Sequence, residues 1–422
     1  MGGERRQGLW LGACLAVGMA ATVSSFAATL SSLAARPSPP ARLTRLATLG
    51  KALFFDRTLS SSGRLACASC HDPANAYGPP PGAGPVMRGG EHMDRPGLRT
   101  VPSLRYLDHV PRFTRHLYLS RTDDPEDVGP GGGLLWDGRA DTLAEQALVP
   151  LLDPREMANR NLRELAARLR SSPAGIGLQA LAHAEQTMRE ARLARPARGS
   201  DDGRLAALAA RALARFELED PSFHPYDSRY DAYLRGTGRL SAQELRGLEL
   251  FNSADKGNCA ECHPSTPGPG GRLPDFTDYR FAAIGVPRNA ALRANATTTY
   301  YDLGLCGPLR VDLLRESTEY CGMFRTPTLR NAARRAYFFH NGRFTTLADV
   351  VRFYATRDLE PTRWYPVHDG HVELYDDLPR TYRENVDRTD PPFDRRPGET
   401  RALSDAEIRD LVAFLRTLDD RS

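Results

Sequence analysis

The sequence has 422 residues, of which 41% are hydrophobic and 26% are charged, with a formal net charge of +4. This composition excludes wholesale disorder and a membrane protein with many spans, and the length predicts two to three globular domains. Arginine carries nearly all the positive charge, because Lys51 and Lys256 are the only lysines, and acidic residues are interspersed with it. No basic stripe indicates a surface for nucleic acid, so we expect no nucleic-acid partner.

The first 35 residues have the pattern of an export signal. Arg5 and Arg6 precede an uncharged stretch, rich in Leu, Ala and Ser, that runs to Ala35. The stretch is also long enough for a membrane-spanning helix, so an uncleaved N-terminal membrane anchor is the alternative. A Pro-rich linker follows at residues 36–40. In either case we expect the rest of the chain to be periplasmic.

Two Cys-x-x-Cys-His motifs come next. The first consists of Cys67, Cys70 and His71, and the second of Cys259, Cys262 and His263. Two thiols at this spacing can add to the two vinyl groups of one porphyrin, while the following imidazole binds the iron. We therefore predict two covalently bound haem c groups, with His71 and His263 as iron ligands.

Two other interpretations of the cysteines are a zinc site built from both pairs and a thioredoxin-like redox pair. Zinc would leave both trailing histidines unexplained. No strand-helix frame of the thioredoxin kind surrounds either motif. The haem interpretation also agrees with export, because covalent haem attachment normally takes place outside the cytoplasm.

The two halves of the chain share more than these motifs. Three further segments recur in the same order, namely GKALF and GLELF, RTVPSLR and RTPTLR, and WDGRADTLAE and HNGRFTTLAD. A repeat of this length predicts a mainly α fold of two duplicated c-type cytochrome domains with long loops, over residues 41–225 and 226–422. Residues 162–213 have the spacing of amphipathic helices, and Ser241 with Glu244 and Ser404 with Glu407 form capping boxes that open later helices.

The register of the last repeated segment sets Pro150 opposite Tyr354. Proline cannot ligate iron, whereas tyrosine can through its phenolate oxygen. The comparison predicts an open coordination site on the first haem and a second haem held between His263 and Tyr354. Met323 is the alternative ligand, since a thioether gives an electron-transfer haem. Simple packing of Tyr354 on a helix over residues 347–355 is a further interpretation.

The remaining cysteines lie apart from the haem motifs. In an oxidising compartment, Cys306 and Cys321 predict a disulfide, and its loop of about 15 residues would be worth roughly 3 kcal/mol in the chain-entropy model. Two free buried thiols are the alternative. Cys14 belongs to the leader, and we assign it no role.

Together these motifs resemble the bacterial dihaem cytochrome c peroxidase family, which includes MauG. The resemblance runs from about residue 46 to residue 418, with insertions, through LGKALFFD, both haem motifs, WDGRA, DPREM and RTPTLRN. It implies a peroxidatic first haem with Gln146 and Glu156 on its distal side and Pro150 beside them. It also implies that Trp136 lies between the two haems as an electron relay.

The resemblance bears on three further positions. At the position of Tyr354, the peroxidases of the family have methionine and MauG has tyrosine, so this chain resembles MauG at that position. A loop histidine caps the first iron in resting peroxidases, and His92 is either that cap or a solvated loop histidine. The family binds calcium between its domains through an asparagine that corresponds to Thr100 here, with carbonyls at Arg335 and Tyr337. The change to threonine argues against calcium.

The residue types also suggest a mechanism. Peroxide reduction needs a group that moves a proton between the peroxide oxygens, and Glu156 suits this role if burial raises its pKa toward neutrality. Gln146 would orient the bound peroxide. The alternative for Glu156 is a carboxylate at a helix N-terminus after Pro154.

We therefore expect a dihaem peroxidase that reduces hydrogen peroxide to water with electrons from a small cytochrome c or cupredoxin. The alternative is a MauG-like oxidase that oxidises aromatic residues of a partner protein through a high-valent state of both haems, which a phenolate from Tyr354 would favour. A third interpretation, a dihaem electron carrier without catalysis, is disfavoured by Pro150, Gln146 and Glu156.

Overall fold

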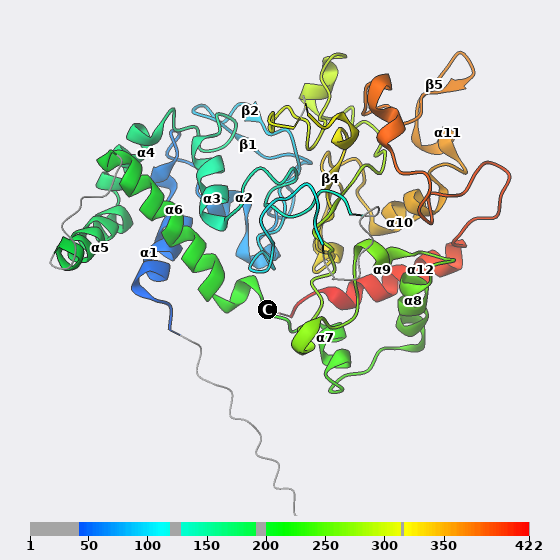
Figure 1. Ribbon diagram of the computed structural model, residues 1–422, viewed down its shortest axis with the longest axis horizontal. Coiled ribbons are helices and arrows are strands. Elements are labelled where there is room, and N and C mark those ends of the chain that lie inside the picture. The colour runs from blue at the N-terminus through cyan, green and yellow to red at the C-terminus, as the bar shows by residue number, and fades with distance from the viewer. Residues whose placement is uncertain (1–41, 119–127, 191–199, 314–315, 422) are drawn as a thin grey trace, which may run out of the picture. The chain divides into compact units, whose positions relative to one another are not determined.

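Helices dominate the regular structure, as the sequence predicts (Figure 1), and in the described part of the chain the strands form only two-residue pairs. The computed structural model describes residues 42–118, 128–190, 200–313 and 316–421. The expected leader or anchor at residues 1–35, with Cys14, and the linker after it lie outside the described residues. Within the described ranges, no helix is long and apolar enough to cross a membrane. Below, residues 42–225 are called the first half and residues 226–421 the second half.

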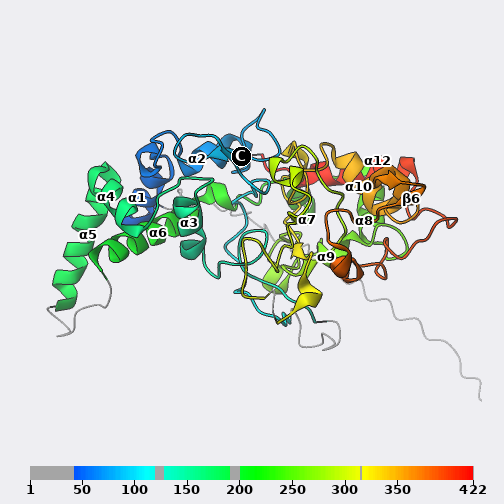
Figure 2. The same ribbon diagram turned by 90° about the horizontal axis from the view of Figure 1, so that it is seen from above.

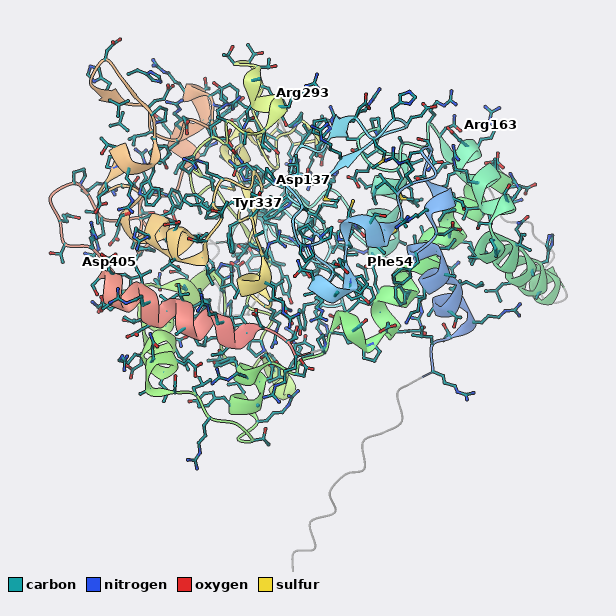
Figure 3. The ribbon with its side chains drawn as sticks, turned by 180° about the vertical axis from the view of Figure 1, so that it is seen from behind. Phe54, Asp137, Arg163, Arg293, Tyr337 and Asp405 are labelled. Carbon is teal, nitrogen blue, oxygen red and sulfur yellow. A yellow bond between two sulfur atoms is a disulfide. The ribbon has the colours of Figure 1, made fainter. Side chains whose placement is uncertain are left out.

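The helices of the first half are α1 (Arg45–Phe54), α2 (Cys67–Cys70), α3 (Leu143–Leu152), α4 (Leu162–Ser171), α5 (Pro173–Glu190) and α6 (Asp201–Glu219). Helix α6 packs along α1 and also contacts α3 and α4, and Figures 1 and 2 show these helices gathered together. A Cβ atom at Gly50 of α1 would lie 1.8 Å from the Ala212 carbonyl oxygen, so only glycine permits this close approach. The shared core includes Phe54, which Figure 3 labels at the end of α1.

The helices of the second half are α7 (Arg229–Leu234), α8 (Ala242–Asn252), α9 (Cys259–Cys262), α10 (Leu347–Thr356), α11 (Pro361–Trp364) and α12 (Asp405–Leu415). Helix α8 packs along α12, and a Cβ atom at Gly247 would lie 2.1 Å from the Asp410 carbonyl oxygen. Gly50 and Gly247 hold matching places in GKALF and GLELF. The predicted capping boxes are confirmed, because Ser241 opens α8 and Ser404 opens α12 (Asp405 is labelled in Figure 3).

Among the residues that the structure describes, short strands pair antiparallel as β1 (Arg88–Gly89) with β2 (Arg95–Pro96), β3 (Phe281–Ala282) with β4 (Phe324–Arg325), and β5 (Val367–His368) with β6 (His371–Val372). A disulfide joins Cys306 to Cys321 just before β4, which is the pairing expected from the sequence. The structure thus closes this loop covalently, and the interpretation of two free thiols is wrong.

A buried cation joins the two halves. The Arg99 guanidinium donates to both carboxylate oxygens of Asp302, at 2.7 and 2.8 Å, and to Asp137 at 2.7 Å. All three side chains are almost wholly removed from solvent. In addition, the Thr100 amide donates to the His340 carbonyl at 2.7 Å. The segment RTVPSLR of the first half is therefore held against the second half by charge as well as by backbone hydrogen bonds.

Candidate active site

The first haem motif lies on α2, a single helical turn after which the chain bends at His71. The His71 Nδ1 donates its proton to the Tyr77 carbonyl at 3.1 Å, since a carbonyl oxygen can only accept. This bond leaves Nε2 as the unprotonated ring atom. Burial lowers the pKa of His71 to about 4, and hydrogen bonds to the Tyr77 and Pro102 carbonyls offset part of that shift. The ring is therefore neutral, which is the form that ligates a metal.

The second motif has the same arrangement on α9. The His263 Nδ1 donates to the Phe276 carbonyl at 2.8 Å. Burial lowers the pKa of His263 to about 4, with an opposing contribution from hydrogen bonds to the Phe276 and Pro327 carbonyls. Pro102 and Pro327 occupy matching places in RTVPSLR and RTPTLR. Each repeat therefore supplies the carbonyl that orients its own histidine, a common device for holding a metal-ligating imidazole.

The motif cysteines are free thiols, and none is paired in a disulfide. Burial raises the pKa of each to about 12, in Cys67, Cys70, Cys259 and Cys262. Redox-active cysteine pairs need the opposite shift, so the thioredoxin-like interpretation has no support. The zinc interpretation needs both pairs to converge, but no group of three or more His, Cys, Asp or Glu side chains within the described ranges could hold a metal ion. Neutral thiols beside an oriented histidine fit covalent attachment of a porphyrin.

A cavity of about 1240 Å³, counted to its opening to solvent, lies at the first motif and is lined by Cys67, Cys70 and His71. Gln146 and Pro150 of α3 and Glu156 after it line the same cavity. Gln146 is buried, and Pro150 offers no side-chain atom that could bind iron. The structure thus brings the predicted distal residues into one cavity with His71.

The turn that carries Glu156 follows directly from its sequence. Helix α3 ends at Leu152, because Pro154 disfavours helical geometry at Asp153 before it. The Asp153 carboxylate accepts a hydrogen bond from the Arg155 amide at 2.7 Å, which closes an Asx turn. The Glu156 amide then donates to the Asp153 carbonyl at 3.0 Å. Glu156 therefore belongs to a tight turn and not to a helix N-terminus, so the alternative of a helix-terminal carboxylate is wrong.

Glu156 lines the cavity and keeps an exposed surface. The protein atoms packed around its carboxyl group desolvate it and raise its pKa to about 7, the nearby Asp153 carboxylate adds to the shift, and Arg139 opposes it. Near neutral pH both protonation states are therefore populated. A carboxyl with this property can accept and return a proton at the working pH.

Trp136 lies between the first cavity and a second one and lines both of them. Its indole Nε1 donates to the Thr100 carbonyl at 2.8 Å, and its own carbonyl accepts from the Arg325 amide at 3.0 Å. These bonds hold the indole between a segment of the first half and strand β4 of the second half. This position agrees with the relay position that the family resemblance implies.

Tyr354 lies on α10 beside the second haem motif. Burial, above all, raises the pKa of its phenol, and the nearby Cys262 and Cys259 add to the shift. Its ring stacks on Phe393, with 5.3 Å between the ring centroids. In the described part of the chain its hydroxyl has no hydrogen-bond partner, which leaves an oxygen free to bind iron. Tyr354 also lies within the aromatic cluster of the second half, so packing and ligation are compatible.

The helices α3 and α10 begin in the same way, which supports the register between Pro150 and Tyr354. Thr142 caps α3 and Thr346 caps α10, each accepting a hydrogen bond from the backbone amide three residues later. Pro150 and Tyr354 both lie eight residues after their caps. Met323, by contrast, packs against the separate apolar cluster of Phe281, Leu305 and Leu313.

His92 occupies the turn of the β1–β2 hairpin, where it is exposed and lines neither cavity. This placement favours the solvated loop histidine over the iron cap. The residues at the expected calcium position do not fit the ion either. The Thr100 hydroxyl donates to the Phe339 carbonyl at 2.8 Å, and Arg335 brings a guanidinium to the Val101 carbonyl at 2.8 Å. Calcium needs converging oxygen ligands, and a neighbouring cation opposes it.

One carboxyl of the first cavity was missed by sequence reasoning. Glu217 of α6 lines the cavity, is only 6% exposed, and has an Oε2 atom with no hydrogen-bond partner. Burial raises its pKa to about 8. A sequence signal was available, because Glu217 falls four residues after Leu213 on the apolar face of an amphipathic helix. A glutamate on such a face is either paired or functional.

Comparisons with known proteins identify the family of this chain. A family model described as di-haem cytochrome c peroxidase matches residues 44–239. The chain is 32% identical over 393 residues to the methylamine utilization protein MauG of Paracoccus denitrificans, covering 92% of this chain and 90% of that protein. It is 26% identical over 309 residues to a cytochrome c551 peroxidase of Nitrosomonas europaea, covering 72% of this chain and 71% of that protein.

A solved structure has the same fold. The diheme peroxidase BthA from Burkholderia thailandensis is 40% identical and superposes with a TM-score of 0.77, covering 92% of this chain and 87% of that one. The chain therefore belongs to the di-haem cytochrome c peroxidase family.

Proposed function

We propose that this protein is a periplasmic dihaem peroxidase that reduces hydrogen peroxide to water with electrons from a small cytochrome c or cupredoxin. The observation that carries the proposal is the cavity in which His71 shares the wall with Glu156, Gln146 and the non-ligating Pro150. The names of peroxidase relatives support the same activity. An electron carrier would need neither an open iron nor an acid–base group beside it.

The residues at both motifs fit haem c. Each haem would be attached by thioethers to its two motif cysteines, with iron on the Nε2 atom of His71 or His263. The Tyr354 phenolate would be a second protein ligand of the second iron. When bound, the first haem supplies an iron that takes up peroxide and passes electrons to it, and the second haem stores an electron or an oxidising equivalent.

Glu156 would manage the protons of the reaction. Reduction of one hydrogen peroxide to two water molecules consumes two electrons and two protons, and the O–O bond breaks more readily when the departing oxygen carries a proton. In its carboxylate form Glu156 would accept a proton from one peroxide oxygen and return it to the other. Its pKa of about 7 makes both transfers feasible at neutral pH. The Gln146 amide would hydrogen-bond the peroxide and orient it for this exchange.

The same arrangement suggests the route of the electrons. Trp136 lines the first cavity and also the second cavity, which lies toward the other haem motif. Its hydrogen bond to Thr100 holds the indole in one orientation. Trp136 would therefore couple the two haems electronically, while electrons from the donor protein enter through the second half.

Steady-state turnover of hydrogen peroxide by the holoenzyme, with a reduced small cytochrome c or cupredoxin as donor, tests the proposal. We expect rapid turnover in the wild type and a loss of at least a hundredfold in Glu156→Gln. The exposed hairpin residue Glu91 supplies the matched control, and Glu91→Gln should keep wild-type turnover. A wild-type holoenzyme with both haems that consumes no peroxide with either donor would overturn the proposal.

A second candidate function is favoured by one specific residue. Tyr354 would supply an oxygen ligand to the second haem, and the chain is 32% identical to a MauG protein. Such an enzyme would oxidise aromatic residues of a partner protein and would keep its oxidising equivalents for longer. After one equivalent of peroxide, a long-lived oxidised state in the near-infrared spectrum with slow donor turnover would favour this function. Fast decay with fast donor turnover would favour the peroxidase.

We also propose that the two halves, over residues 41–225 and 226–422, are duplicated c-type cytochrome domains. The order of a packed helix, a short haem-motif helix and a Thr-capped helix supports this, since α1, α2 and α3 correspond to α8, α9 and α10. The matching glycines Gly50 and Gly247 make the same close helix contact in both halves. The leader or membrane anchor at residues 1–35 stays a prediction.

A further inference from the structure

The second cavity has an unusual distribution of charge. It measures about 770 Å³, counted to its opening, and residues of both halves line it. Four arginines lie in its wall, whereas its lining includes no aspartate, glutamate or histidine. The four are Arg325, Arg330, Arg334 and Arg335.

Two of these arginines already have partners. Arg330 donates to both carboxylate oxygens of the buried Asp231, at 2.7 and 2.9 Å. Arg334 donates to the Asp420 carbonyl, and its charge lowers the pKa of Asp419, which burial raises. Their charges are therefore compensated by the second half of the chain itself.

The other two have no acidic partner among the residues that the structure describes. The Arg335 Nη2 atom donates only to the Val101 carbonyl at 2.8 Å, and the Arg325 Nη1 atom only to the Gly133 carbonyl at 3.3 Å. Burial lowers the pKa of both guanidinium groups to about 10. Arg99 shows the opposite, because its two aspartates raise its pKa. Arg325 and Arg335 thus remain charged at neutral pH, although their burial disfavours the charged form.

An anion bound to Arg325 and Arg335 would offset the free-energy cost of burying their charges. A charge taken out of water costs several kcal/mol unless it is paired, and the guanidinium fork matches a carboxylate in a bidentate geometry. The cavity holds two guanidinium groups without an acidic partner among the described residues, and no acidic residue lines it. It therefore suits a ligand that carries carboxylates.

The position of the cavity identifies the source of those carboxylates. Pro102 and Pro327 line it, and their carbonyls hydrogen-bond His71 and His263. The cavity therefore lies beside both iron ligands. A haem carries two propionate carboxylates on the edge opposite the vinyl groups that the motif cysteines bind. Arg335 is close enough to His71 for its charge to act on the ring.

We infer that Arg325 and Arg335 form a carboxylate cradle that binds haem propionates in the cavity between the two halves. Both side chains start in the second half and reach backbone carbonyls of the first half. The cradle would thus connect the haem propionates to both halves of the chain, in the same cavity that Trp136 lines. It rests on the two haems of the proposed function but not on peroxide turnover.

Reduction potentials of the holoenzyme test this inference. A cation beside an iron favours the reduced state, so Arg325→Gln and Arg335→Gln should each lower the potential of at least one haem. We expect at least a tenfold change in the oxidised-to-reduced ratio, which is about 59 mV for a one-electron couple. Arg325→Lys and Arg335→Lys keep the charge and should restore most of the shift. Arg334→Gln is the matched control from the same wall and should leave both potentials unchanged.

Two results would overturn the cradle. One is an unchanged pair of potentials in the double variant Arg325→Gln/Arg335→Gln, with both haems still attached by mass. The other is a wild-type potential that shifts with added inorganic phosphate or oxalate, since a free anion and not the propionates would then occupy the guanidinium groups. A wild-type preparation without covalent haem would instead contradict the haem sites of the proposed function, so the two failures are distinguishable.

Discussion

Gly89 lies directly against the backbone of Glu156. A Cβ atom at Gly89 would lie 2.3 Å from the Arg155 carbonyl oxygen and 2.6 Å from the Glu156 carbonyl oxygen. The next residue, Gly90, donates its amide to the Glu156 carbonyl at 2.9 Å. The β1–β2 hairpin therefore sets the position of the acid–base carboxyl through backbone contacts alone.

The substitution Gly89→Ala should displace the Glu156 turn, because the clash is with backbone atoms that cannot rotate away. We expect peroxide turnover to fall roughly 10- to 100-fold, as small misplacements of catalytic groups do, with haem content and reduction potentials unchanged. Gly84→Ala is the control, since its nearest neighbour lies 3.8 Å away. Equal turnover of both variants would contradict the contact as a positioning device.

Glu156 should set the pH dependence of turnover. Its raised pKa of about 7 means that the carboxylate, which takes the first proton, is depleted at lower pH. The value of kcat/KM should therefore fall as the pH drops from 8 to 5, with a midpoint near 7. In Glu156→Gln this midpoint should vanish together with most of the activity. A wild-type midpoint near the ordinary glutamate value would show that another group titrates.

Glu217 should make the stability of the holoenzyme pH-dependent. Its pKa in the folded protein, about 8, is above its ordinary value of 4.5, so the folded state binds this proton more tightly than the unfolded state. The free energy of unfolding should therefore decrease as the pH rises from 4.5 to about 8, by on the order of 1–3 kcal/mol. Denaturant unfolding at pH 5 and pH 8.5 measures the loss. Glu217→Gln should be less sensitive to pH, and an identical pH dependence would contradict the assignment.

The Arg99 guanidinium should stabilise the contact between the halves. Removing it by Arg99→Ala leaves Asp302 buried without its cation, whereas Asp137 keeps its ion pair with Arg139, and breaking a buried ion pair on one side costs about 3–5 kcal/mol. Arg99 lowers the pKa of Asp302, so this stabilisation is present above the ordinary aspartate pKa and is lost as the pH falls. Arg115→Ala, which removes an exposed pair with Glu316, should cost less than about 1 kcal/mol. Similar costs for both variants in denaturant unfolding would refute the prediction.

Tyr354→Phe should remove one ligand of the second haem. We expect a changed absorption spectrum, carbon monoxide binding by the reduced second haem, and faster decay of the peroxide-oxidised state. Tyr337→Phe is the control, because no hydrogen bond of its phenol occurs in the described ranges. A Tyr354→Phe variant with the spectrum and turnover of the wild type would exclude Tyr354 as a ligand.

The sequence alone indicated the chemistry of this protein. The two haem motifs depend on covalent spacing, and the register that sets Pro150 opposite Tyr354 depends on two helices that begin with the same threonine cap. Local patterns of this kind are encoded by neighbouring residues and can be read without a fold. The helical character and the disulfide between Cys306 and Cys321 followed for the same reason.

Only the tertiary structure decided how distant residues meet. Gly89 and Glu156 are 67 positions apart, and no local pattern links them. The exposed position of His92, the unpaired oxygen of Glu217, and the lack of an acidic partner for Arg325 and Arg335 among the described residues also required the fold, because burial and missing partners are properties of a packed environment. The sequence determined which groups can bind iron and haem, whereas packing determined which charges stay uncompensated and where each proton resides.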